Sequence, residues 1–352
     1  MKPVIAVIFG GTSDEHDISL LSAMNIIENI DHSHYDILQI GISKQGKMYV
    51  GPNVILSFKH NSHIEELTPC SISTNSLYPG VFILNKENAH VFQKVDLFFP
   101  IVHGTKGEDG TLQGILEYTT VPYVGSGVLG SALGMDKIAM KKIFATYRIP
   151  QVPFLPFTKT QIQIDIISVK EEILANLQYP LFVKPANLGS SIGVQKVKTN
   201  GKLEDALEEA CKYSDRIIVE QGISKMREME CAVIENNHQI ETSVVGEVIP
   251  TGEFYDFESK YHTDGAQMII PALTDKVTLS TIQSLAKQAF QLLDLRGLAR
   301  VDFFVTEEAI FINEVNTLPG FTNMSMFTRL FASQGRDIKM IVQELINSAL
   351  NQ

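Results

Sequence analysis

VIAVIFGG, residues 4–11, is the segment that most clearly indicates the fold of the first domain. Its unbroken apolar run enters two glycines, and residues 18–27 then repeat apolar side chains at the spacing of a helix. Residues 35–42 and residues 95–102 (VDLFFPIV) are two more strand-like runs. Continuous apolar strands that alternate with helices are typical of a parallel sheet covered on both faces. The chain is therefore predicted to begin with a parallel α/β domain.

The rest of the chain is predicted to hold two α+β domains. Residues 55–79 are polar and poorly periodic, which predicts a long surface excursion from the first domain. A lysine-rich helical pattern at residues 135–147 opens a new unit, and Pro150, Pro153 and Pro156 indicate a linker after it. Strands are predicted at residues 179–185, 216–220, 298–305 and 309–314, and helices at 202–213, 276–293 and 337–349. The predicted domains are residues 1–131, 132–223 and 224–352.

The composition places the chain among soluble globular proteins. Hydrophobic residues make up 44% of the 352 and charged residues 20%, a balance that supports several buried cores. The net charge of −11, without a basic run, argues against nucleic acid or an anionic membrane as the main partner. No apolar stretch reaches the ~20 residues of a membrane span, and the first run ends in glycines rather than a signal-peptide cleavage site. Cys70, Cys211 and Cys231 show no paired spacing, which indicates reduced thiols in a cytoplasmic protein.

Carboxylates embedded in two apolar strands predict a metal site. Asp302 lies in ARVDFFV, while Glu314 and Asn316 lie two apart in FINEVN and so project from one face of a strand. A carboxylate in such a run is costly unless it is paired or bound to a metal. Two carboxylates and an amide oxygen suit Mg²⁺, which often also takes oxygens from a bound phosphate. The alternative is an edge strand with solvated carboxylates.

A loop of small residues, GSSIGV at 189–194, follows Lys184. Its backbone N–H groups could converge on phosphate oxygens beside the lysine charge. The loop does not match the Walker A pattern, and a plain hairpin between strands is the alternative. Residues 252–264 mix aromatic and charged side chains without a period, which predicts an ordered loop that covers a site.

Two loops of the first domain follow predicted strands. GGTSDEHDIS (10–19) joins a strand to a helix, where Glu15 and Asp17 either complement the helix dipole or hold a substrate ammonium. HGTKGEDGTLQG (103–114) lies at the carboxyl end of a predicted parallel strand, where α/β proteins bind ligands. A lone histidine more often has a structural role, but the position of His103 makes it a candidate for ligand binding. The glycine fingerprint of a dinucleotide oxidoreductase is absent.

Together these segments resemble the D-alanine–D-alanine ligase family of the ATP-grasp superfamily. The matching segments follow the family's order over nearly the whole chain, which makes the resemblance specific. They are GGTSDEHDIS, HGTKGEDGTLQG, MDK, FVKPANLGSSIGV, VEQG, REME, FYDFESKY, ARVDFF and NEVNTLPGFT. The resemblance implies a three-domain ATP-grasp ligase, in which a parallel α/β domain precedes two α+β domains that clamp ATP.

The resemblance implies ATP as co-substrate and two Mg²⁺ (or Mn²⁺) ions as cofactors. Asp302, Glu314 and Asn316 correspond to the metal ligands. The implied ATP-binding residues are Lys137, Lys184, Lys260 and Ser191 at the phosphates, Glu220, Gln221 and Ile223 at the adenine, Phe254 beside the nucleotide and Glu228 at the ribose. The spacing from Glu220 to Glu228 is one residue longer than is usual in the family, so Glu230 is a rival for the ribose.

The resemblance also implies a site for two amino acids. Its residues are Glu15, Ser190 and Tyr261 as a hydrogen-bonded trio at the first ammonium group, His103 beside that substrate, Arg300 with the Gly320 N–H at the oxyanion, and Ser325 with Met326 at the second carboxylate. The family usually has leucine or methionine at the last of these positions, whereas relatives that prefer D-serine or D-lactate often have arginine. Met326 therefore favours D-alanine.

The implied reaction joins two D-alanine molecules through an acyl phosphate, releases ADP and phosphate, and serves peptidoglycan precursor synthesis. The implied protein is a cytoplasmic homodimer that binds D-alanine and ATP, and neither nucleic acid nor a membrane. A related ligase that makes D-Ala-D-lactate or D-Ala-D-serine is the alternative. A non-catalytic nucleotide-binding regulator is disfavoured because the metal ligands and Arg300 are all present.

Overall fold

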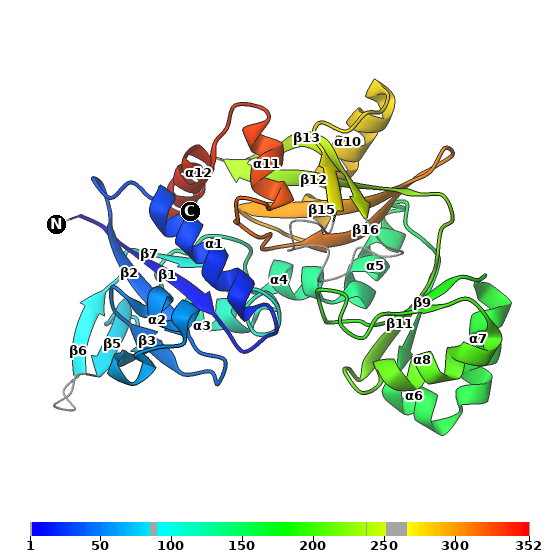
Figure 1. The fold of residues 1–352 in the computed structure, drawn as a ribbon, viewed down its shortest axis with the longest axis horizontal. Helices are drawn as coiled ribbons and strands as arrows, with labels where there is room; N and C mark the ends of the chain where they lie inside the picture. The colour runs from blue at the N-terminus through cyan, green and yellow to red at the C-terminus, as the bar shows by residue number, and fades with distance from the viewer. Residues whose placement is uncertain (1, 85–89, 237, 251–265, 352) are drawn as a thin grey trace.

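A computed structural model of the protein describes residues 2–84, 90–236, 238–250 and 266–351. In this part of the chain three sheets, each built from a consecutive stretch of sequence, form the lobes seen in Figure 1. The first lobe lies on the left of that view, the second sheet on the right, and the third sheet above and between them. The C-terminus returns to the first lobe beside helix α1 (His16–Asn29).

The first sheet has the strand order β6-β5-β4-β3-β2-β1-β7. Its strands are β1 (Val4–Gly10), β2 (Asp36–Ile42), β3 (Met48–Val50), β4 (Thr68–Ile72), β5 (Gly80–Leu84), β6 (His90–Lys94) and β7 (Leu97–Pro100). Strand β1 pairs in parallel with β2 and β7, as its buried apolar run predicted. The remaining pairs, from β2 to β6, are antiparallel. The sheet is therefore mixed, and the prediction of a parallel sheet was correct only for its centre.

Residues 55–79 are not a surface excursion, so that prediction was wrong. They include most of helix α2 (Val54–His60), the short helix η1 (Ile64–Glu66) and strand β4. Val54 and Phe58 of α2 are buried in the core beside β1. The helix is too short to display a period in the sequence, and β4 is held by main-chain pairing on both sides.

The second sheet has the order β10-β9-β11-β8, with antiparallel pairing throughout. Its strands are β8 (Phe154–Thr158), β9 (Leu181–Pro185), β10 (Gln195–Val197) and β11 (Arg216–Gln221), and its helices are α6 (Lys159–Ile164), α7 (Ile166–Asn176) and α8 (Leu203–Ala210). Val183 and Val219 face the core formed with these helices. The alternation of strand side chains sends Lys184 and Glu220 to the opposite face. Pro156, predicted in a linker, lies in the edge strand β8, where proline is tolerated.

The third sheet has the order β14-β13-β12-β15-β16 and is antiparallel. Its strands are β12 (Arg227–Asn236), β13 (Gln239–Pro250), β14 (Ala266–Ile269), β15 (Leu298–Val305) and β16 (Ile310–Asn316). Helix α10 (Lys276–Leu292) packs on one face with α5 (Lys137–Thr146), whose Met140 and Phe144 enter that core. Helices α11 (Met326–Ala332) and α12 (Ile338–Leu350) pack on the other face.

The first and third sheets share a hydrophobic core. It contains residues of β1 and β7 together with residues of β12, α11 and α12. The ring of Phe321, in the loop before α11, lies 6.4 Å from that of Phe99 in β7 and 5.3 Å from that of Phe327 in α11. The two lobes are thus joined by a continuous apolar contact, while the domain boundaries given above remain predictions.

The predicted helix at residues 135–147 is interrupted at Asp136. Helix α4 (Val128–Met135) ends there, and the Asp136 carboxylate caps α5 by accepting the Ala139 N–H at 2.8 Å. After this break, Lys137 is the first residue of α5, and its side chain lies where the three lobes meet. Helix α3 (Thr111–Thr119), after the loop that starts at His103, completes the first lobe.

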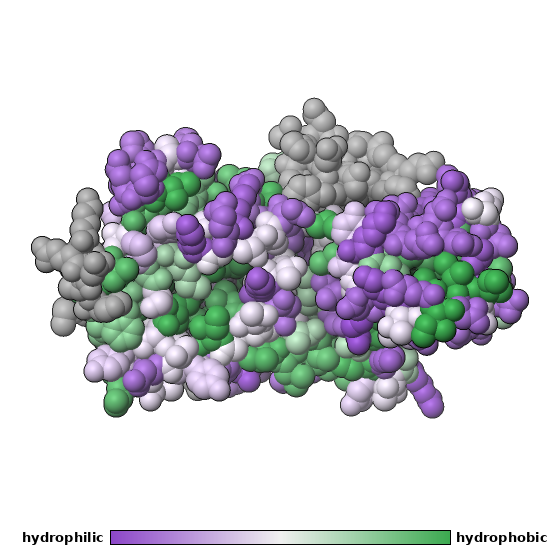
Figure 2. Space-filling view, turned by 90° about the horizontal axis from the view of Figure 1, so that it is seen from below, coloured by the Kyte–Doolittle hydropathy of each residue, from purple (hydrophilic) through white to green (hydrophobic). Residues whose placement is uncertain are grey.

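The surface is consistent with a charged globular protein. Figure 2 shows hydrophilic side chains over much of the right-hand lobe, with apolar residues in smaller patches on both lobes. No helix among the described residues is long and apolar enough to cross a membrane.

Candidate active site

Two pockets of the described structure meet where the three lobes converge. The larger has a volume of about 520 Å³ and lies between the second and third sheets. The smaller has a volume of about 80 Å³ and lies between the first lobe, the loop after Leu188 and the loop before α11. Lys137, Gly189, Ser190 and Glu314 line both pockets. A ligand group bound in one pocket therefore lies beside a group bound in the other.

The inner wall of the large pocket holds a cluster of buried charges. Glu220 Oε2 accepts a hydrogen bond from Lys184 Nζ at 2.6 Å, and Glu220 Oε1 lies 3.0 Å from Lys141 Nζ. The Lys141 contact is an ion pair rather than an aligned hydrogen bond. Burial would raise the pKa of Glu220, but the charges of the two lysines outweigh it and lower the pKa to about 2. Glu220 is therefore a carboxylate that holds Lys184 at the pocket wall.

Lys141 was not predicted as a site residue. It is 1% exposed, and its Nζ lies 5.6 Å from the centre of the Phe154 ring. Burial lowers the pKa of Lys141, against the opposing effect of Glu220. Lys141 follows Lys137 by one helical turn in a lysine-rich helix, and that spacing was the available signal.

Glu228 and Glu230 occupy different places on β12. Glu230 is buried, and its Oε2 lies 2.8 Å from Nε of Arg300. Glu228 is half-buried in the wall of the large pocket, near the rim residues Gln221 and Ile223. Glu230 lines the same pocket but also contacts Arg300, and the choice between Glu228 and Glu230 at the ribose stays a prediction.

The predicted metal ligands come together at the junction of the pockets. Asp302 and Glu314 are direct partners on the paired strands β15 and β16, and Arg300 pairs with Asn316 next to them. Asp302 accepts two hydrogen bonds from Arg300 at 2.7 Å, and Asn316 Nδ2 donates to Asp302 Oδ2 at 3.0 Å. Glu314 Oε2 lies 3.6 Å from Lys137 Nζ.

This donor set fits divalent metal ions. Cations already surround Asp302 and Glu314, and the two carboxylates face the large pocket with hard oxygen atoms. A turn of the Asn316 amide would present its oxygen in place of its nitrogen. Within the described residues no group of three or more His, Cys, Asp or Glu side chains forms a site, so phosphate oxygens would have to complete the coordination.

The loop after Lys184 has an unusual backbone conformation at two serines. Ser190 and Ser191 have φ values of +51° and +59°, in the left-handed region that non-glycine residues rarely adopt. Ser191 lines the large pocket. Ser190 donates a hydrogen bond to Glu15 Oε1 at 2.6 Å, and so ties the second lobe to the first. Lys137 Nζ donates to the carbonyl oxygen of Leu188 at 2.9 Å and secures the same loop.

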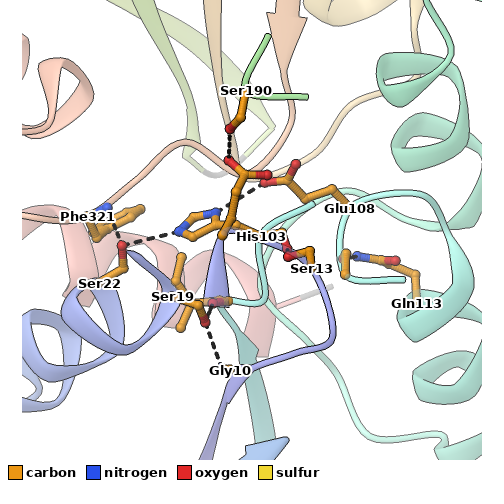
Figure 3. A network of polar contacts seen from close by, with 12 residues as sticks. Gly10, Ser13, Ser19, Ser22, His103, Glu108, Gln113, Ser190 and Phe321 are labelled. Carbon is orange, nitrogen blue, oxygen red and sulfur yellow. Dashed lines mark hydrogen bonds and ion pairs between the residues drawn. The ribbon is translucent and has the colours of Figure 1, made fainter. Parts of the chain in front are cut away.

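The small pocket is lined on one side by Glu15, His103 and Glu108. Figure 3 shows His103 and Glu108 close together. His103 is buried, and its Nδ1 lies 3.1 Å from Glu108 Oε1. Burial would lower the pKa of His103, but the hydrogen bond and charge of Glu108, with the charge of Glu15, raise it. Burial and the charge of Glu15 raise the pKa of Glu108. Glu108 was missed, although it stands in the same quoted motif as His103.

The other side of the small pocket is the loop before α11. Gly320, Ser325 and Met326 line it as predicted, together with Met268 of β14. A Cβ atom on Gly320 would lie 2.9 Å from Ser325 Oγ, so glycine allows this close approach. Met326 is buried, which gives this end of the pocket an apolar wall.

Three predicted residues, Phe254, Lys260 and Tyr261, lie outside the described residues, as does the predicted covering loop at 252–264. The other predicted residues all line one or both pockets. The site therefore draws on all three lobes, with anion-binding groups on one side and a small polar chamber on the other.

Comparison with known proteins assigns the chain to a family. The description "D-ala D-ala ligase N-terminus" matches residues 4–126, and "D-ala D-ala ligase C-terminus" matches residues 143–347. The chain belongs to the D-alanine–D-alanine ligase family.

Individual relatives agree with the family assignment. A D-alanine–D-alanine ligase from Thermoanaerobacter sp. (strain X514) is 41% identical, over 99% of this chain and 97% of the relative. One from Enterococcus faecalis (strain ATCC 700802 / V583) is 40% identical, over 99% of each chain. Both relatives cover the complete three-lobed structure.

Solved structures of the family have the same fold. The VanG D-Ala:D-Ser ligase from Enterococcus faecalis has a TM-score of 0.89 and 34% identity, and covers 99% of this chain and 100% of its own. The D-alanine–D-alanine ligase from Coxiella burnetii has a TM-score of 0.87 and 33% identity, over 99% of this chain and 94% of its own. The three-domain ATP-grasp fold expected from the sequence is thus confirmed.

Proposed function

We propose that this chain joins two D-alanine molecules into D-alanyl-D-alanine through an acyl phosphate, with release of ADP and phosphate, for peptidoglycan precursor synthesis. One observation carries the proposal: the anion-binding pocket and the small polar pocket share Lys137, Ser190 and Glu314. A carboxylate held in the small pocket lies next to the end of a phosphate chain held in the large one. Phosphoryl transfer between bound groups requires this arrangement.

The large pocket binds ATP in this proposal. Lys184, Lys137 and the Ser191 loop hold the phosphates, and Gln221 and Ile223 flank the adenine, with Glu220 behind them. Glu228 receives the ribose hydroxyl groups. Phe254 and Lys260 are proposed from the family resemblance alone. Asp302, Glu314 and Asn316 would hold Mg²⁺ or Mn²⁺, which neutralises phosphate charge when bound.

The small pocket binds the two amino acids. Glu15, held by Ser190 at 2.6 Å, receives the ammonium group of the first D-alanine, and the predicted Tyr261 completes this trio. His103 lies beside that substrate. The second D-alanine places its carboxylate near Ser325 and its methyl group against Met326.

Ligation follows attack of the second amine on the acyl phosphate carbon. The carbonyl oxygen then gains negative charge, and phosphate leaves when the amide bond forms. Arg300 and the Gly320 N–H line the small pocket and can stabilise that charge. They come from two different elements, Arg300 from β15 and Gly320 from the loop before α11.

The residues around Met326 and the known relatives bear on the identity of the second amino acid. A D-Ala:D-Ser ligase shares the fold, whereas the curated relatives at 40–41% identity are D-alanine–D-alanine ligases. The apolar wall at Met326 favours a methyl group over a hydroxymethyl group, because a buried hydroxyl without a partner costs about 1–3 kcal/mol. A homodimer in the cytoplasm is proposed on the resemblance alone.

The test measures phosphate release and products together. Purified protein with ATP and Mg²⁺ receives D-alanine, L-alanine, or D-alanine mixed with D-serine or D-lactate. We expect D-alanyl-D-alanine and phosphate in equal amounts, and no product from L-alanine. A mixed product as the main species would replace the assignment with the D-serine or D-lactate ligase. Phosphate release that no amino acid stimulates would overturn the proposal.

A further inference from the structure

Two side chains of helix α1, in the first lobe, form hydrogen bonds with the main chain of Phe321, the residue that follows Gly320. The Phe321 N–H donates to Ser22 Oγ at 3.1 Å, and Asn25 Nδ2 donates to the Phe321 carbonyl oxygen at 2.6 Å. Ser22 and Asn25 are one helical turn apart and belong to α1, almost 300 residues before Phe321 in the chain. Both polar groups of Phe321's backbone are therefore satisfied by a different lobe.

The two side chains that form these hydrogen bonds are buried, and the neighbours of Asn25 define which way its amide points. Ser22 is 0% exposed and Asn25 is 9% exposed. Asn29 Nδ2 donates to Asn25 Oδ1 at 3.3 Å, which places the Asn25 amide nitrogen toward the Phe321 carbonyl. The Phe321 ring is fixed between Phe99 and Phe327. The two peptide groups that flank the Phe321 Cα thus each make one hydrogen bond to α1, and the Phe321 side chain is held by its neighbours.

The same serine connects this loop to the substrate pocket. Ser22 Oγ lies 3.2 Å from His103 Nε2, and His103 Nδ1 lies 3.1 Å from Glu108 Oε1. Figure 3 shows His103 between Ser22 and Glu108, with Phe321 beyond the serine. When Nδ1–H donates to Glu108, Nε2 of the neutral ring accepts the Ser22 hydroxyl, and the hydroxyl oxygen remains free to accept the Phe321 N–H. A continuous chain of donors and acceptors runs from Glu108 to Phe321.

We infer that Ser22 and Asn25 are positioning residues for the ligation step, because they hold the backbone of Phe321 and thereby the adjoining residue Gly320, whose N–H is to meet the developing oxyanion. This inference rests on the proposed role of Gly320. A backbone donor contributes fully only if its direction is set before the charge forms. Because the N–H and C=O of Phe321 are both bound by α1, that helix helps to set the course of the loop next to Gly320.

The inference predicts a defect confined to the second half of the reaction. Acyl phosphate formation does not need the oxyanion donor, whereas amine attack does. In Ser22→Ala the acyl phosphate should still form. Because ligation is then slow, water should hydrolyse part of the acyl phosphate before the amine attacks. We expect kcat for dipeptide to fall about tenfold to a hundredfold, with the KM for ATP unchanged and more phosphate than dipeptide produced.

Ser19→Ala is the matched control. Ser19 is equally buried on the same helix, one turn before Ser22. It accepts the Gly10 N–H at 2.7 Å and donates to the Ile101 carbonyl, both within the first lobe. The change should alter stability by a comparable amount and leave the ratio of phosphate to dipeptide at one. Asn25→Asp is the second test variant, because it keeps the shape of the side chain and removes the donor to Phe321.

The experiment measures phosphate, dipeptide, KM for ATP and the thermal unfolding midpoint for the wild type and the three variants. Excess phosphate in folded Ser22→Ala or Asn25→Asp, and not in Ser19→Ala, supports the inference. A ratio of one with unchanged kcat in a folded Ser22→Ala or Asn25→Asp protein overturns it. An equal excess in Ser19→Ala also overturns it, because the effect would then be structural. Wild-type protein that makes no dipeptide would instead refute the proposed function itself.

Discussion

Replacing Lys141 with methionine should destabilise the protein strongly, although the residue makes no predicted contact with substrate. Lys141 is 1% exposed and shares Glu220 with Lys184. The fall in the pKa of Glu220 from its ordinary 4.5 to about 2 corresponds to about 3 kcal/mol in favour of its charged form. Burial opposes that fall, and the charge of Lys141 makes the largest contribution to it. Lys184 shares in that effect, so the expected cost is taken from buried ion pairs in general. Removing one partner of such a pair costs about 3–5 kcal/mol, and Lys141→Met, which keeps the approximate length and volume of the side chain, should destabilise the protein by about that much.

Denaturant unfolding at neutral pH measures this cost, and Lys142→Met is the matched control. Lys142 is the exposed neighbour on the same helix, and its replacement should change stability by less than about 0.5 kcal/mol. The double variant Lys141→Met/Glu220→Gln should be more stable than Lys141→Met. It removes the buried negative charge of Glu220, which has lost the Lys141 partner in the single variant. A Lys141→Met protein as stable as the wild type would refute the reasoning.

Acid should reduce the cost of Lys141→Met. The folded pKa of Glu220 is depressed, so its stabilisation is present above pH 4.5 and is lost as the pH falls toward 2. Without Lys141 that folded pKa rises, and less stability remains to be lost. The difference between wild type and variant should be smaller at about pH 3.5 than at pH 7. An equal difference at both values would show that the effect comes from packing and not from charge.

Three further predictions concern the pockets. Arg300→Ala should lower kcat about a hundredfold or more with a small change in the KM for ATP, and a defect in ATP binding alone would move Arg300 to the nucleotide. Glu314→Gln should leave the circular dichroism spectrum unchanged and abolish most activity across a Mg²⁺ titration, since it removes a negative charge from the proposed metal site; a wild-type rate at low Mg²⁺ would contradict this. Glu108→Gln should lower the pKa of His103, because the Glu108 hydrogen bond and charge raise it against burial. The acidic limb of kcat/KM for D-alanine should then shift to lower pH, unless His103 does not titrate in the reaction.

The centre of the fold could be predicted because its strands are apolar without interruption. Strand β1 is buried on both faces, so every position shows the same signal in the sequence. Strand β4 and helix α2 could not be predicted in this way. Strand β4 alternates between half-buried and exposed positions with little hydrophobic contrast, and α2 has less than two full turns. Their places are set by pairing with β3 and β5 and by contacts with β2, which are relations between distant segments.

The same distinction applies to the site. Asp302 and Glu314 could be found from sequence, because a carboxylate in an apolar strand is unusual in its own surroundings. Their pairing with Arg300 and Lys137 could not, since it depends on the register of β15 with β16 and on the break at Asp136. Lys141 and Glu108 looked ordinary in a lysine-rich helix and in an acidic loop. Only their burial beside Glu220 and His103 gives them a role.

The sequence of helix α1 contains a weaker indication of a contact between distant segments. Ser19, Ser22 and Asn25 are spaced three residues apart, so they lie along one face of the helix. The residues next to them in the sequence are mostly apolar. Polar side chains on a buried face must find partners, because an unsatisfied buried group costs about 1–3 kcal/mol. Ser19 finds them within its own lobe, whereas Ser22 and Asn25 find them on Phe321 of another. A polar stripe on a buried helix face therefore indicates a contact that the local sequence does not contain, and here that contact joins the first lobe to the loop that carries Gly320.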